Sequence, residues 1–401
     1  MKVKSLGHIN KQTLYFILSI TFERIGFYGV RSLLVLHLIS SPFEMSNSES
    51  MSIYGWFTSL LVFAKIVGGL SGDFIIGNKK SIILGSFLQA LGAFLLCIPS
   101  IYGLYSGLFF VVLGGGMYAP NLTANFGKLF LTQTSTLDSK FTLLYLFTNI
   151  GAFIGAAGLG FLAYKYNPIF SFIIAGFLFL LSIIPIFKTY KENNESSENT
   201  YTKNNRLISI GSILLLIVLF WTINSTSAMR FLDMESQFKQ IMRPDISPHI
   251  LSQLNVIFLI PLSLIFYFVW NKYFNGQLYK IAFAFIFGAL SITILIFIPE
   301  TPSEKHLLFY IASLLFMSIA EVHIAPLIHS VLTKYSKPNF LATLISLSFL
   351  PFALASLIFT LFRKASYENS DLMLIIGTAS MTLTGMCLFI YLIRTKKHKL
   401  P

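Results

Sequence analysis

The sequence predicts an all-α membrane protein with twelve transmembrane helices in two bundles of six. Three observations lead to this fold class. The chain of 401 residues is 55% hydrophobic and only 11% charged, whereas soluble domains carry about 25% charged residues. Its apolar residues form runs long enough to cross a bilayer, which takes about 20 residues each. A polar stretch near the middle of the chain separates two groups of such runs.

Twelve apolar runs are long enough to be membrane-spanning helices. Several of them are rich in Gly, which lets membrane helices pack closely. The predicted spans are residues 13–40, 52–76, 80–100, 104–127, 140–163, 168–188, 207–229, 250–271, 279–299, 306–331, 339–362 and 371–393.

The polar stretch KENNESSENTYTKNNR, residues 191–206, is predicted to be a solvated cytoplasmic linker. It separates an N-terminal six-helix bundle, residues 1–190, from a C-terminal six-helix bundle, residues 207–401. The longest outside loop is expected at residues 230–249, which mix both signs of charge. We expect an amphipathic surface piece or a gate cover there.

The positive charges predict the topology. The net charge is +13, and most of the 29 Lys and Arg residues fall on one side if both termini are cytoplasmic. Lys2 and Lys4 precede an apolar run that is too long for a secretory signal, so we expect an uncleaved first helix. The expected location is therefore the plasma (inner) membrane, with several passes and both ends inside.

Composition and motifs also exclude several classes of protein. The positive charges are scattered over short loops, which argues against nucleic-acid binding. Cys97 and Cys387 both lie within predicted spans and offer neither a disulfide framework nor metal-ligand spacing. Because we find no grouping of nucleophile, acid and base and no phosphate-cradling loop, we expect no enzyme, no metal and no cofactor.

Five ionisable residues fall inside predicted spans: Glu23, Arg24, Arg31, Lys65 and Glu321. A charge at the bilayer centre costs about 2.5–3.5 kcal/mol even on the lenient insertion scale, so such groups usually face a wet cavity or a partner. The N-terminal half thus has three cations and one acid, and the C-terminal half has one acid. A cavity between walls of opposite charge suits a zwitterionic ligand.

Structural roles are the alternative for these residues. Glu23 could pair with Arg24 or Lys65 to hold helices together, and Arg31 could snorkel to the outer interface. Asn149 and Asn255 could bond across helices, and His323 could be a packing residue.

Seven motifs, in order along the chain, resemble those of the proton-dependent oligopeptide transporters. The first resembles ExxERFxYYG followed by a basic residue, and the third resembles GTGxFKPN. The matching segments are TFERIGFYGVR (21–31), GGLSGDFIIGNKKSI (68–82), GGGMYAPN (114–121), FTLLYLFTNIGAF (141–153), FW (220–221), SQLNVIFLIPL (252–262) and AEVHIAP (320–326).

This resemblance implies the major facilitator fold, alternating access and proton-driven uptake of di- or tripeptides. Arg24 and Arg31, with Tyr28 on the same helical stripe, would meet the peptide carboxylate. The resemblance assigns Asn149 and Asn255 to the peptide amides, and Glu321 to the amino group. It also implies that Asp73, with Lys79 and Lys80, latches neighbouring helices on the inside.

The chain departs from the family pattern at the residues implied in coupling. Ile20 stands where the first-helix motif has its first Glu, and Ala119 stands where the fourth-helix motif has Lys. In the seventh helix, Ser225 and Thr226 stand in place of Glu and Gln. Glu23 is then the one carboxylate left in the N-terminal half of the cavity, so we expect it to be the proton-sensitive site. Lys65 is a candidate replacement cation.

The leading prediction is a secondary transporter of small peptides or related zwitterionic solutes, monomeric and driven by the proton gradient. One alternative is a facilitator or exporter of an amino acid, an anion or a drug, which the cationic N-terminal half would favour. Another is a non-transporting membrane sensor or assembly protein.

Overall fold

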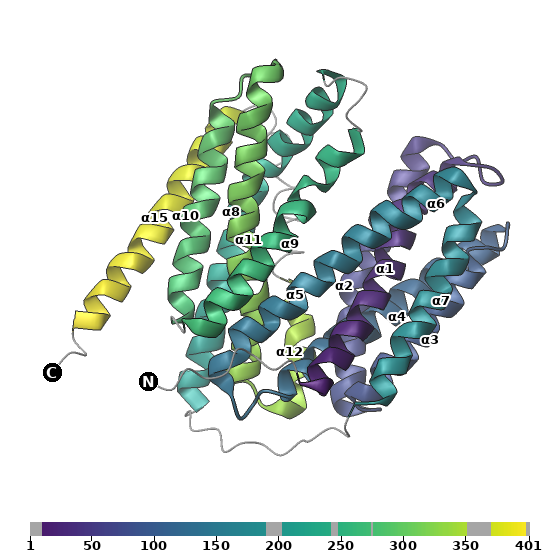
Figure 1. Ribbon diagram of the computed structural model, residues 1–401, viewed down its shortest axis with the longest axis horizontal. Helices are drawn as coiled ribbons and strands as arrows, with labels where there is room; N and C mark the ends of the chain where they lie inside the picture. The colour runs from purple at the N-terminus through teal and green to yellow at the C-terminus, as the bar shows by residue number, and fades with distance from the viewer. Residues whose placement is uncertain (1–9, 190–202, 242–247, 274–275, 351–369, 398–401) are drawn as a thin grey trace. The chain divides into compact units, whose positions relative to one another are not determined.

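The chain is all-helical in the computed structural model, which describes residues 10–189, 203–241, 248–273, 276–350 and 370–397 (Figure 1). No strand occurs in these ranges. The helices before the gap at 190–202 are α1 (Lys11–Ile39), α2 (Asn47–Phe74), α3 (Asn78–Leu95), α4 (Ile101–Lys128), α5 (Leu137–Phe153), α6 (Gly160–Lys165) and α7 (Pro168–Phe187). Those after it are α8 (Lys203–Ile241), α9 (Pro248–Lys272), α10 (Gln277–Ile296), α11 (Leu307–Tyr335), α12 (Leu341–Leu347) and α15 (Ser370–Lys397). Short turns are η1 (Thr134–Thr136), η2 (Ile154–Leu159), η3 (Glu304–His306) and η4 (Pro338–Phe340).

Each predicted span overlaps a described helix. Nine helical stretches of the described chain are long and apolar enough to cross a membrane. α1 and α3 are not among them, since α1 carries three of the intramembrane charges and α3 begins with Asn78, Lys79 and Lys80. The all-α membrane fold is confirmed. The eleventh span, 339–362, lies partly outside the described residues, so the count of twelve stays a prediction.

The chain divides into two compact units. Unit 1 comprises Met1–Thr202 and Leu332–Leu350, and unit 2 comprises Lys203–Val331 and Pro351–Pro401. The break after Thr202 falls within the predicted linker, whose last four residues begin α8. The end of α11 and the whole of α12 pack with unit 1, where α12 contacts α2 and α4. The predicted bundle limits, 1–190 and 207–401, do not assign residues 332–350 to the N-terminal part.

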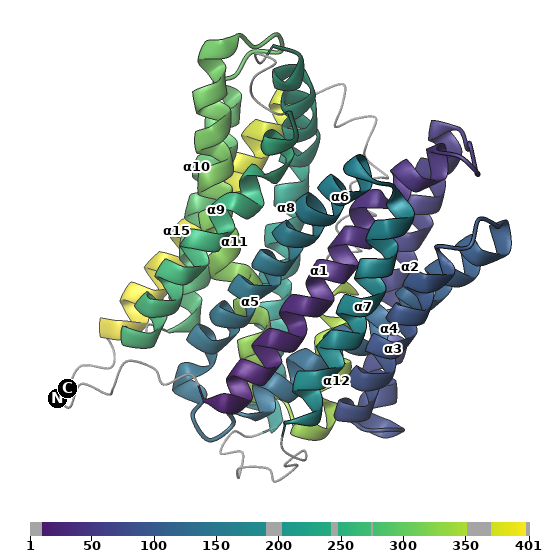
Figure 2. The ribbon, with the colours of Figure 1, turned by 45° about the vertical axis from the view of Figure 1, so that its right-hand side comes forward.

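Close helix contacts in unit 1 depend on small residues, as in other membrane bundles. A Cβ atom at Gly85 would lie 2.6 Å from the carbonyl oxygen of Gly114, so α3 and α4 touch through their backbones. On α5, a Cβ at Gly151 would lie 2.7 Å from the Cβ of Arg24. The glycine at position 151 lets α5 lie close to α1, and both views show these two helices side by side (Figures 1 and 2).

The fifth span is irregular where it passes α1. After Phe153 the helix continues as the π-helical turn η2 before α6 begins. A Cβ at Gly155, inside this turn, would collide with the carbonyl group of Ile25. Single π-helical turns often occur at functional sites, and this one adjoins the charged part of α1.

In unit 2 the prediction of a loop from residue 230 is wrong for residues 230–241, which continue α8 to Ile241. The 39 residues of α8 span about 58 Å at 1.5 Å per residue, far more than the ~30 Å hydrocarbon core. The part of α8 after residue 229 is attached to the rest of unit 2, because Arg230 Nη2 donates a hydrogen bond to the Ile298 carbonyl at 2.6 Å. Phe238, which is buried, packs on Tyr310 at the start of α11.

Candidate substrate and coupling site

Four of the predicted site residues lie on α1, which packs against α2, α5 and α7. The helix begins after Asn10, whose side chain accepts from the Gln12 N–H at 2.8 Å and so caps the first turn. The contact with α5 and α7 buries one face, and the charged residues of the middle of α1 are carried into the bundle with it.

Glu23 is the most enclosed of these residues, with no exposed side-chain surface. Its Oε2 lies 3.2 Å from Arg24 Nε, and the Arg24 side chain is 16% exposed. Besides Arg24, the side-chain amide of Gln89 and the charge of Lys65 act on its carboxylate. The predicted ion pair with Arg24 is therefore present.

Lys65 on α2 belongs to the same group of charges. The charges of Glu23, Arg24 and Arg31 act on its ammonium group, and Lys65 in turn acts on Glu23. Its Nζ lies 3.5 Å from the ring centroid of Phe349. Unit 1 therefore gathers three cations and one acid, as the sequence indicated.

Arg31 is held by tyrosines. Its Nε donates to the Tyr54 hydroxyl at 2.9 Å, and its guanidinium carbon lies 5.9 Å from the Tyr28 ring and 5.8 Å from the Tyr54 ring. The stripe on α1 predicted Tyr28 but not Tyr54, because nothing in a single sequence pairs position 54 of α2 with position 31 of α1. Both tyrosines keep the guanidinium half-buried, with its remaining donors available.

Tyr118 on α4 is a second residue that the sequence did not single out. It replaces the Phe of the fourth-helix motif, and its hydroxyl lies 2.7 Å from Ser19 Oγ in the buried core. Ser19 donates to the Ser182 carbonyl at 2.8 Å, and Ser86 Oγ lies 2.9 Å from Ser182 Oγ. This chain of hydroxyls ties α1, α3, α4 and α7 together one turn below Glu23.

The hydrogen bonds of Asn149 and Asp73 are made to backbone groups and to Asn78. The Asn149 amide donates to the Tyr145 carbonyl of its own helix at 2.8 Å. Asp73, at the end of α2, accepts from the backbone N–H of Thr343 at 2.7 Å and of Ala342 at 3.4 Å, at the start of α12. Asp73 thus joins α2 to α12, while Lys79 donates to the Thr189 carbonyl at 2.7 Å.

In unit 2 the predicted residues Glu321 and Asn255 are brought together. Asn255 Nδ2 donates to Glu321 Oε2 at 3.2 Å, and Ser318 Oγ donates to Asn255 Oδ1 at 2.6 Å. The described part of the chain contains no ion pair to Glu321. Glu321 is therefore hydrogen-bonded to a neutral amide. The sequence did not reveal that Asn255 and Glu321 are partners.

A buried cation near His323 was also missed. Lys280 is 1% exposed, with Nζ 4.4 Å from the Trp270 ring, and its charge acts on His323. His323 Nδ1 lies 2.7 Å from the Ile319 carbonyl, and its ring lies 4.4 Å from that of Phe266. These contacts fit the packing role considered for His323. Within the described residues no group of acids, His and Cys could hold a metal.

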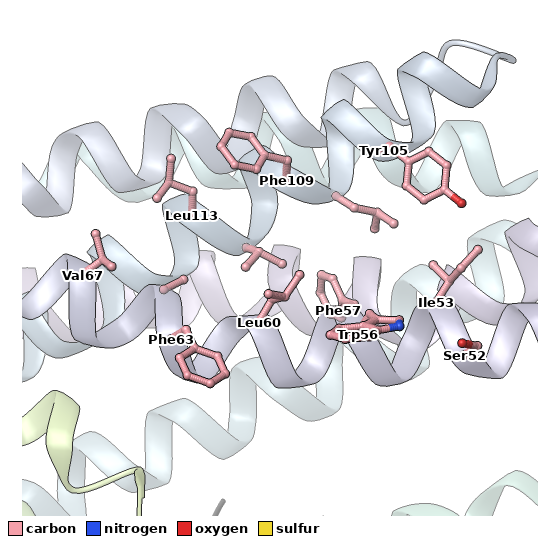
Figure 3. A pocket seen from close by; sticks show the side chains of 13 residues that line it. Ser52, Ile53, Trp56, Phe57, Leu60, Phe63, Val67, Tyr105, Phe109 and Leu113 are labelled. Atoms are coloured by element: carbon pink, nitrogen blue, oxygen red, sulfur yellow. The ribbon is translucent and has the colours of Figure 1, made fainter.

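An apolar groove lies elsewhere, between α2 and α4 (Figure 3). Its volume is about 610 Å³, and no ionisable acid or base lines it. Its lining includes Trp56, Phe57 and Leu60 from α2 and Tyr105, Phe109 and Leu113 from α4, which Figure 3 labels. Such a lining offers nothing to a charged solute, so the charge groups around Glu23 and Glu321 are the better candidates for a site.

The chain is similar to known membrane transport proteins. A family model for the Major Facilitator Superfamily matches residues 16–393. Dipeptide and tripeptide permease A of Serratia proteamaculans is 25% identical over 225 residues, which are 54% of this chain and 44% of the permease. Dipeptide and tripeptide permease B of Xenorhabdus bovienii is 28% identical over 211 residues, 51% of this chain and 43% of the permease. The matched part spans less than half the length of these relatives.

Solved structures agree on the fold. The peptide transporter POT, solved in complex with sulfate, superposes with a TM-score of 0.68 at 20% identity, covering 98% of this chain and 96% of its own. The human organic anion transporter MFSD10 gives a TM-score of 0.72 at 13% identity, covering 96% of this chain and 100% of its own. The resemblance predicted from the seven motifs is confirmed.

Proposed function

This chain belongs to the Major Facilitator Superfamily, and we propose that it is a secondary transporter of small peptides or related zwitterionic solutes. One observation carries the proposal: three cations surround the acid Glu23 in unit 1, whereas Glu321 in unit 2 has no ion-pair partner among the described residues. Unit 1 has Arg24, Arg31 and Lys65 around one acid, and unit 2 has Glu321 held by a neutral amide. The names of the permeases that the chain resembles support the same substrate class.

The roles follow from the chemistry of each group. Arg31, fixed by Tyr54 and Tyr28, is a ready donor to a substrate carboxylate, because guanidinium groups bind carboxylates with two hydrogen bonds. Glu321 would receive the substrate ammonium group. Asn255 is hydrogen-bonded to Glu321 and Ser318, so its role in this scheme is to position the acid. Asn149 would bind a peptide amide only by giving up its hydrogen bond to the Tyr145 carbonyl.

Coupling is assigned to Glu23. It is fully buried beside Arg24, and Lys65 and Gln89 act on it. Gain or loss of a proton here changes the charge of the whole group, which suits a proton-driven cycle. The driving force is then the proton gradient, without a bound cofactor. The chain is a multi-pass membrane protein, for which we propose the inner membrane, cytoplasmic termini and a monomeric state.

Reconstitution tests the proposal. Proteoliposomes containing the purified chain should take up radiolabelled dialanine, and an imposed pH gradient, acid outside, should raise the accumulated amount. In parallel, a thermal-shift panel of amino acids, dipeptides and tripeptides at two pH values reports binding, since a ligand of the folded state raises the melting temperature. Binding without uptake would instead identify a sensor or assembly protein.

A second candidate has one observation in its favour. In the group of charges around Glu23, three cations against one acid leave a surplus of positive charge, which suits an anionic cargo. A facilitator or exporter of an anion would be stabilised in the same panel by acids that lack an amino group. A zwitterion transporter would not be.

A further inference from the structure

Ser318, which the sequence did not single out, lies behind the side-chain amide of Asn255. Ser318 is fully buried, whereas Asn255 and Glu321 each keep some exposed surface that a ligand can reach. Ser318 Oγ lies 2.6 Å from Asn255 Oδ1, 2.8 Å from the Leu314 carbonyl oxygen and 3.5 Å from the Asn255 carbonyl oxygen. All three atoms are acceptors, so the hydroxyl donates, and the amide oxygen is the nearest acceptor for its one hydrogen.

The other side of the same amide faces the acid. Asn255 Nδ2 donates to Glu321 Oε2 at 3.2 Å, and a charged carboxylate can only accept. With the amide turned over, Oδ1 would face that carboxylate and Nδ2 would lose its acceptor, which is costly for groups shielded from water. Ser318 and Glu321 therefore fix one orientation of Asn255 from opposite sides.

This orientation decides what Asn255 and Glu321 present to a ligand. The amide oxygen is turned toward the buried Ser318, and the described residues give the second hydrogen of Nδ2 no acceptor. The carboxylate keeps capacity to accept further hydrogen bonds. The pair thus presents a donor and an acceptor side by side, and the complementary ligand carries an acceptor next to a donor.

An α-amino acyl group has this complementary pattern. Its ammonium group donates, and the carbonyl oxygen on the neighbouring carbon atom accepts. A plain alkyl amine has only the donor, and a peptide whose amino group is acetylated has lost the charged donor. The site therefore distinguishes these three kinds of ligand by the number of hydrogen bonds that each can make.

We propose that Ser318 is a positioning residue that makes this site selective for an ammonium group with a carbonyl oxygen beside it. The inference rests on the proposed function for the pairing of Glu321 with the ammonium group. The second N–H of Asn255 donates to the carbonyl oxygen. Peptides with a free amino end meet both requirements, so the substrate class narrows from amines in general to α-amino acyl compounds.

Calorimetric titration with two ligands tests this selectivity. The (E)-alkene isostere of dialanine keeps the length and both charged ends of the peptide but has no carbonyl oxygen between them. We expect it to bind the parent chain about tenfold more weakly than dialanine, the loss of one hydrogen bond. In Ser318→Ala the freed amide can turn its oxygen to the ammonium group, so the ratio should fall below about threefold.

Further variants show whether Ser318 acts through Asn255. Ser313→Ala is the matched control and should keep the parent ratio, because Ser313 is equally buried on α11 but donates to the Ser291 carbonyl at 2.8 Å. Asn255→Ala should abolish the selectivity, and adding Ser318→Ala should change it no further. Ser318→Thr, which keeps the hydroxyl, should preserve the parent ratio. Melting temperatures show that each variant is folded.

An unchanged ratio in Ser318→Ala would overturn the proposal, since the hydroxyl hydrogen would then serve the Leu314 carbonyl. Equal affinities of the parent chain for the two ligands would overturn it as well, as would the same fall of the ratio in Ser313→Ala.

Dialanine uptake separates this proposal from the proposed function. Selective binding by a parent chain that moves no peptide refutes transport alone. Uptake without selectivity refutes this inference alone, and a parent chain that binds neither ligand refutes both.

Discussion

The two units treat a buried acid in different ways. In unit 1, Glu23 lies 3.2 Å from Arg24 and within the field of Lys65, so its charge is balanced by the protein. In unit 2, Glu321 is met by the neutral amide of Asn255. We propose that Glu23 is the proton-sensitive group and that Glu321 receives a cation from the substrate. On this proposal, coupling belongs to unit 1 and recognition of an amine to unit 2.

The largest effect on stability should come from removing the cation that pairs with Glu23. Arg24→Gln removes the ion-pair partner of a fully buried carboxylate, and breaking such a pair costs about 3–5 kcal/mol. We expect a clear fall in the melting temperature of the purified protein. Glu23→Gln/Arg24→Gln should recover most of it, and a double variant as unstable as Arg24→Gln would show that Glu23 is not held by Arg24.

Glu321→Gln should change the melting temperature little but should strongly lower the affinity for ligands. Loss of a charged hydrogen bond costs about 1.5–3 kcal/mol, so affinity for peptides with a free amino group should fall about 10- to 100-fold. Titration calorimetry with dialanine measures it. If affinity is unchanged, Glu321 does not meet the amine.

Glu23→Gln separates coupling from binding. Without a group that can change charge, an imposed pH gradient should no longer raise dialanine accumulation, whereas exchange of internal for external dialanine should continue. Uptake and counterflow in the same proteoliposomes give the comparison. Undiminished gradient-driven accumulation would rule out Glu23 as the proton-sensitive site.

The smallest effect is expected at Tyr118. Tyr118→Phe restores the residue type of the family motif but removes the hydroxyl that bonds Ser19. One buried hydrogen bond contributes about 0.5–1.5 kcal/mol, so the melting temperature should drop slightly. Ser86→Ala, at the far end of the same hydroxyl chain, is the control. A larger loss of transport than of stability in Tyr118→Phe would reveal a direct role.

The sequence was a good guide to features that one helix carries by itself. Apolar runs predicted the helices, since the length of a span follows from bilayer thickness. The charges of α1 predicted a site because burying charge is costly wherever it occurs. The continuation of α8 to Ile241 was missed, because hydropathy marks where a helix leaves the lipid and not where it ends.

Features made by two helices were beyond a single sequence. Tyr54 holds Arg31 and Phe349 receives Lys65, and both depend on which faces of α1, α2 and the segment 332–350 meet. The same is true of Asn255 beside Glu321 and of Lys280 over Trp270. No periodicity within one span specifies such pairs.

The central claim, that Glu321 recognises a substrate amine, is tested most directly by changing the ligand and the protein together. Dissociation constants of dialanine and N-acetyl-dialanine are compared for the parent chain and for Glu321→Gln. We expect acetylation to weaken binding about 10- to 100-fold in the parent and less than about twofold in the variant, because the lost partner is the same. An equal cost of acetylation in both proteins would contradict the account.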